Sequence, residues 1–190
     1  MGRGERFTKM SGTLTLILGG IKSGKSRHAL ELARERGAGH PVGFIATAEA
    51  FDEEMKIRIR KHREEREALF FTIEEPLHLS RAIAEGWAKS PCLVVDCLTL
   101  WVNNLLFHLE PTPQKIRDER NTFLGMMNQK KGDLILVSNE VGSGLVPENA
   151  LTRRYMDELG NLNQAVARAS DEVIIMIAGI PRRLKGSVHV

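Results

Sequence analysis

Four residues near the start of the chain have the types and spacing of a phosphate-binding loop. Gly19, Gly24, Lys25 and Ser26 fit the pattern G-x-x-x-x-G-K-[ST]. In such a loop the backbone N–H groups surround a phosphate, the lysine reaches the β- and γ-phosphates, and the serine hydroxyl can ligate Mg²⁺. The alternative is a glycine-rich strand-to-helix turn with a surface lysine. An apolar run before the motif and a helical pattern after it favour a nucleotide site made by Gly19, Gly20, Ile21, Lys22, Ser23, Gly24, Lys25 and Ser26.

An acidic residue ends a later apolar run. Asp96 closes the segment 91–97, where a Walker B carboxylate would hold Mg²⁺ directly or through water. The alternative is that Asp96 caps the helix that begins near Leu98. The phosphate-binding loop upstream favours the first role, so Ser26 and Asp96 are the predicted metal ligands.

One histidine stands in an unusual setting. The charged segment 52–66 has acidic residues first and basic residues later, which complements a helix dipole. In a helix, His62 would share a face with Arg58 and Arg66. Beside a triphosphate it could clamp phosphate or, when neutral, attack phosphorus covalently. Spacing alone favours a solvated surface histidine.

The remaining candidates leave their alternatives open. His28 could contact substrate or face solvent, and the other histidines have no metal-ligand spacing. The segment 139–149 follows an apolar strand, so it is either a ligand-binding loop or a simple connection. Cys92 and Cys97 should point to opposite faces and form no mutual disulfide, which suits a reducing cytosol.

Continuous apolar runs alternate with amphipathic segments along the chain, which predicts an α/β fold with a mostly parallel sheet and helices on both faces. One domain over 13–190, preceded by an extension over 1–12, is expected from the length. The predicted strands are 14–19, 41–47, 69–73, 91–97, 133–138 and, as the final core strand, 172–178. The predicted helices are 26–36, 52–66, 76–89, 98–109, 113–130 and 151–170.

Bulk composition narrows the classes of partner. The formal net charge of +3 suits anionic substrates such as nucleotides, but acidic residues interrupt every basic run, so no nucleic-acid stripe is evident. The first ten residues lack the apolar region of a signal peptide. Apolar runs are too short to span a bilayer, so neither membrane insertion nor nucleic-acid binding is expected, and a cytoplasmic location is predicted.

Several stretches together resemble the bifunctional adenosylcobinamide kinase/adenosylcobinamide-phosphate guanylyltransferase family of cobalamin biosynthesis. They are the phosphate-binding loop 19–27, the segments 44–48 and 52–62, the segment 96–107, the loop 138–147 and the C-terminal segment 179–181. The loop alone is generic. The histidine segment and the Asn-Glu-Val-Gly-x-Gly-hydrophobic-Val-Pro pattern are specific.

The resemblance implies a RecA-like P-loop fold, a homotrimer and two reactions in one pocket. Adenosylcobinamide is phosphorylated with ATP or GTP, and GMP is then transferred from GTP onto that phosphate through a guanylylated histidine. The motif places that histidine at His62, and Lys25 is the second catalytic residue. Further nucleotide contacts are implied for Ala46, Thr47, Ala48, Arg63, Glu64, Glu65, Arg66, Glu74 and Asp96.

Two departures and two rival functions accompany this resemblance. Ala48 stands where the family often has serine, and Asp96 is one methylene shorter than the glutamate of some members. One rival is a P-loop kinase for another small hydroxyl acceptor, in which His62 only clamps phosphate. The other is a RecA-like ATPase stimulated by nucleic acid, which the interrupted charge pattern disfavours. The choice between ATP and GTP in the first step stays open.

Overall fold

The computed structural model describes residues 12–49, 69–109 and 112–186. In this part of the chain, seven strands form one sheet in the order β3-β2-β4-β5-β1-β6-β7. All neighbouring strands are parallel except β6 and β7, which are antiparallel. The strands are β1 Leu14–Gly19, β2 Val42–Ala46, β3 Phe70–Glu74, β4 Cys92–Asp96, β5 Asp133–Val137, β6 Glu172–Ile177 and β7 Ile180–Lys185.

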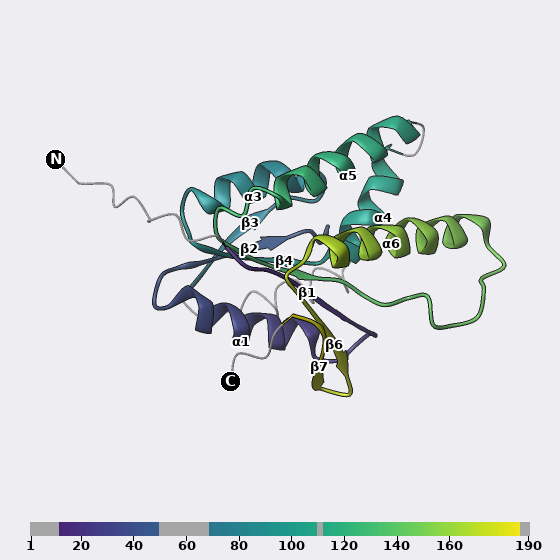
Figure 1. Cartoon of the computed structure of the whole chain (residues 1–190). Helices are drawn as coiled ribbons and strands as arrows, with labels where there is room; N and C mark the ends of the chain where they lie inside the picture. Colours follow the sequence, from purple (N-terminus) through teal and green to yellow (C-terminus); the bar gives the residue numbers. More distant parts are fainter. Residues whose placement is uncertain (1–11, 50–68, 110–111, 187–190) are drawn as a thin grey trace.

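Helices cover both faces of this sheet, as Figure 1 shows. Helix α1 lies on one face, and α3, α4, α5 and α6 lie on the other. Their bounds are α1 Lys25–Gly37, α3 Leu79–Trp87, α4 Leu98–Leu109, α5 Pro113–Met127 and α6 Ala150–Ala169. The predicted α/β class and the mostly parallel sheet are therefore confirmed, whereas the predicted helix over 52–66 lies outside the described residues.

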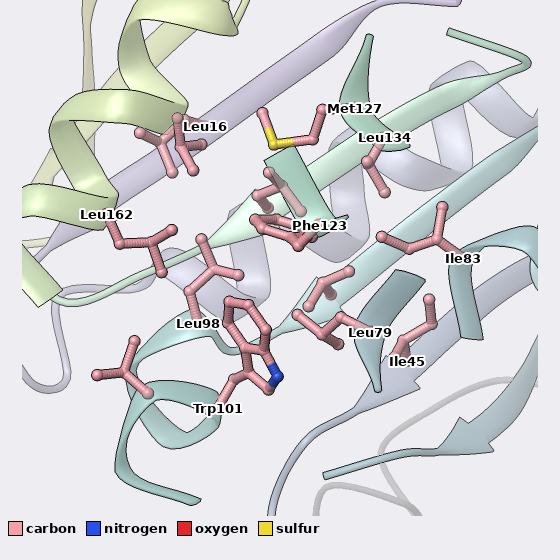
Figure 2. Close-up of a cluster of buried hydrophobic side chains, with 14 of the residues drawn as sticks. Leu16, Ile45, Leu79, Ile83, Leu98, Trp101, Phe123, Met127, Leu134 and Leu162 are labelled. Carbon is pink, nitrogen blue, oxygen red and sulfur yellow. The ribbon is translucent and has the colours of Figure 1, made fainter. Parts of the chain in front are cut away.

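The sheet separates two hydrophobic clusters because successive strand residues point to opposite faces. Leu16 of β1 packs with Trp101 and Phe123 in the cluster under α3 to α6 (Figure 2). Its neighbour Ile17 packs with Ala29 of α1 in the second cluster. Both faces of β1 are buried, which explains why its sequence is a continuous apolar run rather than an alternating one.

One strand was not predicted, and one predicted boundary was wrong. The final core strand predicted over 172–178 is β6, and β7 follows it as an exposed antiparallel edge strand rich in Arg and Lys, a pattern without apolar alternation. The helix predicted from Pro76 begins at Leu79 instead. The carboxylate of Glu75 accepts the backbone N–H groups of Leu77 and His78, at 3.1 and 3.0 Å, and this turn delays the helix.

Candidate functional site

The phosphate-binding loop joins β1 to α1, as predicted. Gly19 has a φ of 152°, and a Cβ there would lie 2.5 Å from the carbonyl oxygen of Met176 on the neighbouring strand. Gly24 has a left-handed φ of 95° and precedes α1 without any side-chain cap. Only glycine fits both conformations. The first N–H groups of α1 are thus left to bind an anion at the positive end of the helix dipole.

The Lys25 side chain folds back across the loop. Its Nζ donates to the carbonyl oxygen of Gly20 at 2.6 Å and lies 3.5 Å from the Ser23 Oγ. Burial lowers the pKa of Lys25, and the nearby Cys97 and Asp96 partly oppose this effect. A buried ammonium group held over the loop is placed to exchange its carbonyl partner for a phosphate oxygen.

The loop is held in place by the turn that follows the neighbouring strand β6. The backbone N–H of Gly179, after β6, donates to the carbonyl oxygen of Ser23 at 3.0 Å. Within the loop, the N–H of Ser23 donates to the Gly20 carbonyl oxygen at 3.3 Å. Ile21 and Lys22 lie exposed at the tip, where Ile21 keeps 85% of its surface accessible.

The two predicted metal ligands meet although they are 70 residues apart in sequence. The Ser26 hydroxyl donates to Asp96 Oδ1 at 3.3 Å. Asp96 is the last residue of β4 and lies two residues before α4, so the same carboxylate is near both the Ser26 hydroxyl and the start of that helix. A hydroxyl and a carboxylate oxygen this close are the hard donors that Mg²⁺ prefers, so these residues fit the ion.

Two further predicted contact residues lie in one row with Asp96, at the carboxyl ends of neighbouring strands. Ala46, the last residue of β2, is in register with Glu74 of β3 on one side and with Asp96 of β4 on the other. At about 4.8 Å between strands, Glu74 lies four strands from β1, roughly 19 Å away along this edge. A ligand group at Glu74 would therefore be far from the phosphates. Ala48 lies two residues beyond the end of β2 and is half-buried.

Thr47 is fully buried and joins β2 to the turn after β4. Its hydroxyl donates to the carbonyl oxygen of Cys97 at 2.8 Å and accepts the Cys97 N–H at 2.9 Å. Asn104, also fully buried, donates to the carbonyl oxygens of Thr47 and Pro76, at 2.8 and 3.2 Å. The side chain of Thr47 thus positions the Asp96–Cys97 turn in this structure. Sequence reasoning missed Asn104, whose signal was an amide within an apolar helical run.

The loop after β5 leaves the sheet at the same end as the phosphate-binding loop (Figure 1). The N–H of Asn139 donates to the Thr99 Oγ1 at 2.7 Å, and its carbonyl oxygen accepts from Asn163 Nδ2 at 3.0 Å. The N–H of Glu140 donates to the carbonyl oxygen of Gly19 at 3.1 Å. The start of this loop is therefore fixed to the phosphate-binding loop on one side and to α4 and α6 on the other.

The remaining candidates are the histidines, the residues after His62 and the two cysteines. His28 is half-buried on α1, with its Nδ1 3.9 Å from a Glu31 carboxylate oxygen. The predicted catalytic His62 and its neighbours Arg63, Glu64, Glu65 and Arg66 lie outside the described residues. Within the described ranges, no group of three His, Cys, Asp or Glu side chains could hold a metal ion. Cys92 and Cys97 are both free thiols, as predicted.

The chain is similar in sequence to proteins of one known family. The model of the family "Cobinamide kinase / cobinamide phosphate guanyltransferase" matches residues 15–184. The bifunctional adenosylcobalamin biosynthesis protein CobP of Pseudomonas aeruginosa is 48% identical over 171 residues, covering 90% of this chain and 96% of that protein. The corresponding protein CobU of Salmonella typhimurium is 37% identical, covering 90% of this chain and 99% of its own length.

Solved structures resemble the chain in fold only. A KaiC-like protein of Pyrococcus horikoshii has a TM-score of 0.52 at 16% identity, over 87% of this chain and 71% of that one. The flagellar accessory protein FlaH of Methanocaldococcus jannaschii has a TM-score of 0.51 at 16% identity, over 93% and 80%. No helix in the described ranges is long and apolar enough to cross a membrane.

The family match covers most of the chain, and its relatives are aligned over nearly their whole length. The seven-stranded, mostly parallel sheet with its helices agrees with the RecA-like fold of the solved neighbours. The chain is therefore an enzyme that belongs to the cobinamide kinase/cobinamide phosphate guanyltransferase family.

Proposed function

We propose that this enzyme phosphorylates adenosylcobinamide with ATP or GTP and then transfers GMP from GTP onto the new phosphate. The product of the two steps is adenosylcobinamide-GDP, and the second step passes through a guanylylated His62. The family match supports the pair of reactions. The observation that carries the nucleotide chemistry is the close approach of Ser26 and Asp96 beside the phosphate-binding loop.

Residues of the loop would hold the triphosphate. The N–H groups at the start of α1 and the ammonium group of Lys25 face the space above the loop and would stabilise charge on the β- and γ-phosphates. Ser26 and Asp96 would hold Mg²⁺, which when bound neutralises phosphate charge. The side chains therefore serve both steps by fixing one nucleotide in one place.

The two steps differ in which phosphorus atom reacts. In the first, the acceptor hydroxyl attacks the γ-phosphorus and the nucleoside diphosphate leaves. In the second, neutral His62 attacks the α-phosphorus of GTP, pyrophosphate leaves, and the cobinamide phosphate then takes GMP from the histidine. Arg63, Glu64, Glu65 and Arg66 follow His62 directly in the sequence and are proposed to contact the nucleotide.

Labelling with α-labelled GTP tests the covalent step. A phosphoramidate is labile in acid and stable in base, so the wild type should carry acid-labile label and His62→Ala should carry none. His78→Ala is the matched control, because His78 pairs with Glu119 on the surface, with 2.8 Å between Nδ1 and Oε1. Equal labelling of the wild type and His62→Ala would rule the intermediate out.

A parallel assay with γ-labelled ATP or GTP distinguishes the principal rival. If γ-phosphate transfer proceeds without any nucleotidyl intermediate, and adenosylcobinamide is not the acceptor, the chain is a P-loop kinase for another hydroxyl compound. We further propose a single domain over 13–190, a homotrimer and a cytoplasmic location. Light scattering tests the assembly, with a mass about three times the chain's 21.2 kDa expected.

A further inference from the structure

Glu140 emerges from the sheet between the two halves of the phosphate site. Strand β5 lies between β1, which carries the phosphate-binding loop, and β4, which carries Asp96. The last residue of β5, Val137, is in register with Ile17 on one side and Asp96 on the other. The next residues after β5 therefore leave the sheet directly over the gap that the Ser26–Asp96 contact spans.

The backbone that carries Glu140 is fixed on both sides. The N–H groups of Ser138 and Glu140 donate to the carbonyl oxygens of Ile17 and Gly19, at 3.0 and 3.1 Å, and so extend the ladder with β1 to the first residue of the phosphate-binding loop. On the side of α4 and α6, the intervening Asn139 is held by Thr99 and Asn163. The position of Glu140 relative to the loop is thus set by rigid elements.

The side chain of Glu140, in contrast, is exposed. Its Oε1 accepts the N–H of Gly142 at 2.9 Å, which orients the carboxylate. Among the described residues, no Lys, Arg or His forms an ion pair with it. A carboxylate that is oriented, accessible and not neutralised by a cation is able to accept a proton from a bound molecule.

We propose that Glu140 is the catalytic residue that receives the proton of the acceptor hydroxyl in the phosphorylation step. The hydroxyl oxygen forms a bond to the γ-phosphorus, while the bond from that phosphorus to the β,γ-bridging oxygen breaks and its electron pair leaves with the nucleoside diphosphate. The hydroxyl proton moves to a Glu140 carboxylate oxygen and is then released to water. This inference rests on the proposed function.

The two reactions of the enzyme make different demands on such a residue. An alcohol must lose a proton when it attacks phosphorus, whereas the phosphate monoester that accepts GMP is already an anion at neutral pH. Loss of the carboxylate should therefore impair the first reaction and spare the second. A residue that merely supported the loop structure would affect both reactions together.

The test measures both reactions separately in the full chain. Glu140→Gln and Glu140→Ala are each expected to lower the kcat of adenosylcobinamide phosphorylation by about 100-fold or more. GMP transfer to supplied adenosylcobinamide phosphate should stay within about threefold of the wild-type rate, and the nucleotide Kd, measured by calorimetry, should not change. Retained GMP transfer also shows that the variants are folded.

Glu148→Gln is the matched control, because Glu148 is an exposed glutamate on the same loop. It should leave both rates unchanged. Full phosphorylation by Glu140→Gln, or a parallel loss of both reactions, would overturn the assignment. If the wild type itself phosphorylates no adenosylcobinamide, the proposed function fails, which is a separate outcome from a failure of Glu140 alone.

Discussion

At the scale of single residues, the burial of the Lys25 ammonium group should lower the stability of the fold. Its ammonium group is withdrawn from water, and burial lowers its pKa, although Cys97 and Asp96 partly compensate. Its contacts with the Gly20 carbonyl oxygen and the Ser23 hydroxyl do not involve a full counter-ion. A buried ammonium group without a full counter-ion contributes little to the stability of the fold, so we expect Lys25 to serve the proposed nucleotide.

Replacement of this lysine should therefore separate stability from binding. We expect Lys25→Met to keep or slightly raise the melting temperature of the nucleotide-free protein and to lower both reaction rates by about 100-fold or more. In the wild type, nucleotide at about 100 times its Kd should raise the melting temperature by about 5–10 °C. Thermal melting with and without GTP measures this.

Lys115→Met serves as the control, since Lys115 is exposed on α5. It should retain the full nucleotide-dependent rise. A Lys25→Met protein that is stabilised by GTP as strongly as the wild type would remove the lysine from the nucleotide site.

At the scale of elements, one threonine connects the ends of two strands. The Thr47 hydroxyl bonds both the N–H and the carbonyl oxygen of Cys97, and Asn104 of α4 holds the Thr47 carbonyl oxygen. Together they fix the turn that presents Asp96 to Ser26. Thr47 therefore fixes the end of β4 beside Ser26.

Thr47→Val tests this connection, because valine keeps the shape and removes the hydroxyl. The Cys97 N–H would be left buried without its partner, so we expect the free energy of unfolding to fall by about 2 kcal/mol. Nucleotide affinity should fall as well, because Asp96 loses its fixed position. Urea unfolding and calorimetry measure the two effects. Thr122→Val, on the exposed face of α5, should change neither.

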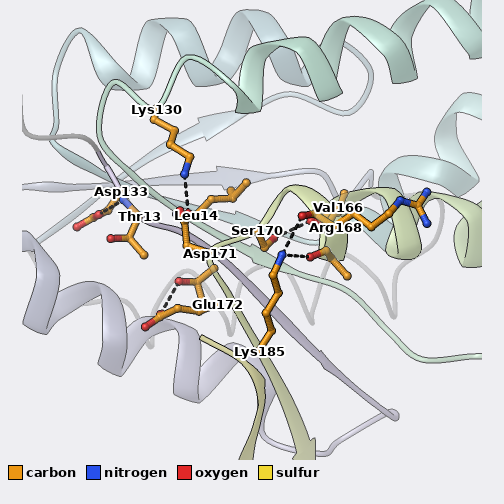
Figure 3. A network of polar contacts seen from close by, with 12 residues as sticks. Thr13, Leu14, Lys130, Asp133, Val166, Arg168, Ser170, Asp171, Glu172 and Lys185 are labelled. Carbon is orange, nitrogen blue, oxygen red and sulfur yellow. Dashed lines mark hydrogen bonds and ion pairs between the residues drawn. The ribbon is translucent and has the colours of Figure 1, made fainter. Parts of the chain in front are cut away.

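At the scale of the whole molecule, hydrogen bonds and ion pairs connect several elements at the amino-terminal end of the parallel strands (Figure 3). Glu172 of β6 accepts from Thr15 of β1, from Arg36 of α1 and from Arg183 of β7. Beside it, Asp171 accepts from Lys130 at 2.6 Å. This network connects both layers of the fold at the end opposite the nucleotide site.

The network predicts a loss of stability in acid. Burial tends to raise the pKa of Glu172, but the hydrogen bonds from Arg183, Arg36 and Thr15 outweigh it, so the pKa is lowered. A carboxylate with a lowered pKa in the folded state stabilises the fold above its unfolded value of about 4.3, and this contribution disappears as the pH falls through the folded value.

We therefore expect Glu172→Gln to lower the melting temperature by about 5 °C at pH 7 and by much less at pH 3. Melting curves of the variant and the wild type over this range measure the difference. Glu85→Gln, in an exposed pair with Lys89 on α3, should show a small difference at every pH. A Glu172→Gln deficit that does not shrink in acid would contradict the linkage.

Local patterns in the sequence were sufficient for several conclusions. The continuous apolar runs predicted most of the parallel strands, and the glycine spacing predicted the turn between β1 and α1. These signals are local, because a buried strand and a tight phosphate-binding turn each place demands on consecutive residues. The exposed strand β7 has no such pattern, which explains why it was missed.

Tertiary structure decided which segments meet. An apolar strand does not encode its neighbours, so the sequence left open that β5 lies between β1 and β4. This order brings Ser26 to Asp96 across 70 residues and places Glu140 beside Gly19. The sequence by itself predicted a nucleotide site at the Gly19–Ser26 loop and the turn that forms it. The strand order determined which side chains surround it, because parallel strands pair through distant crossovers and only packing selects among them.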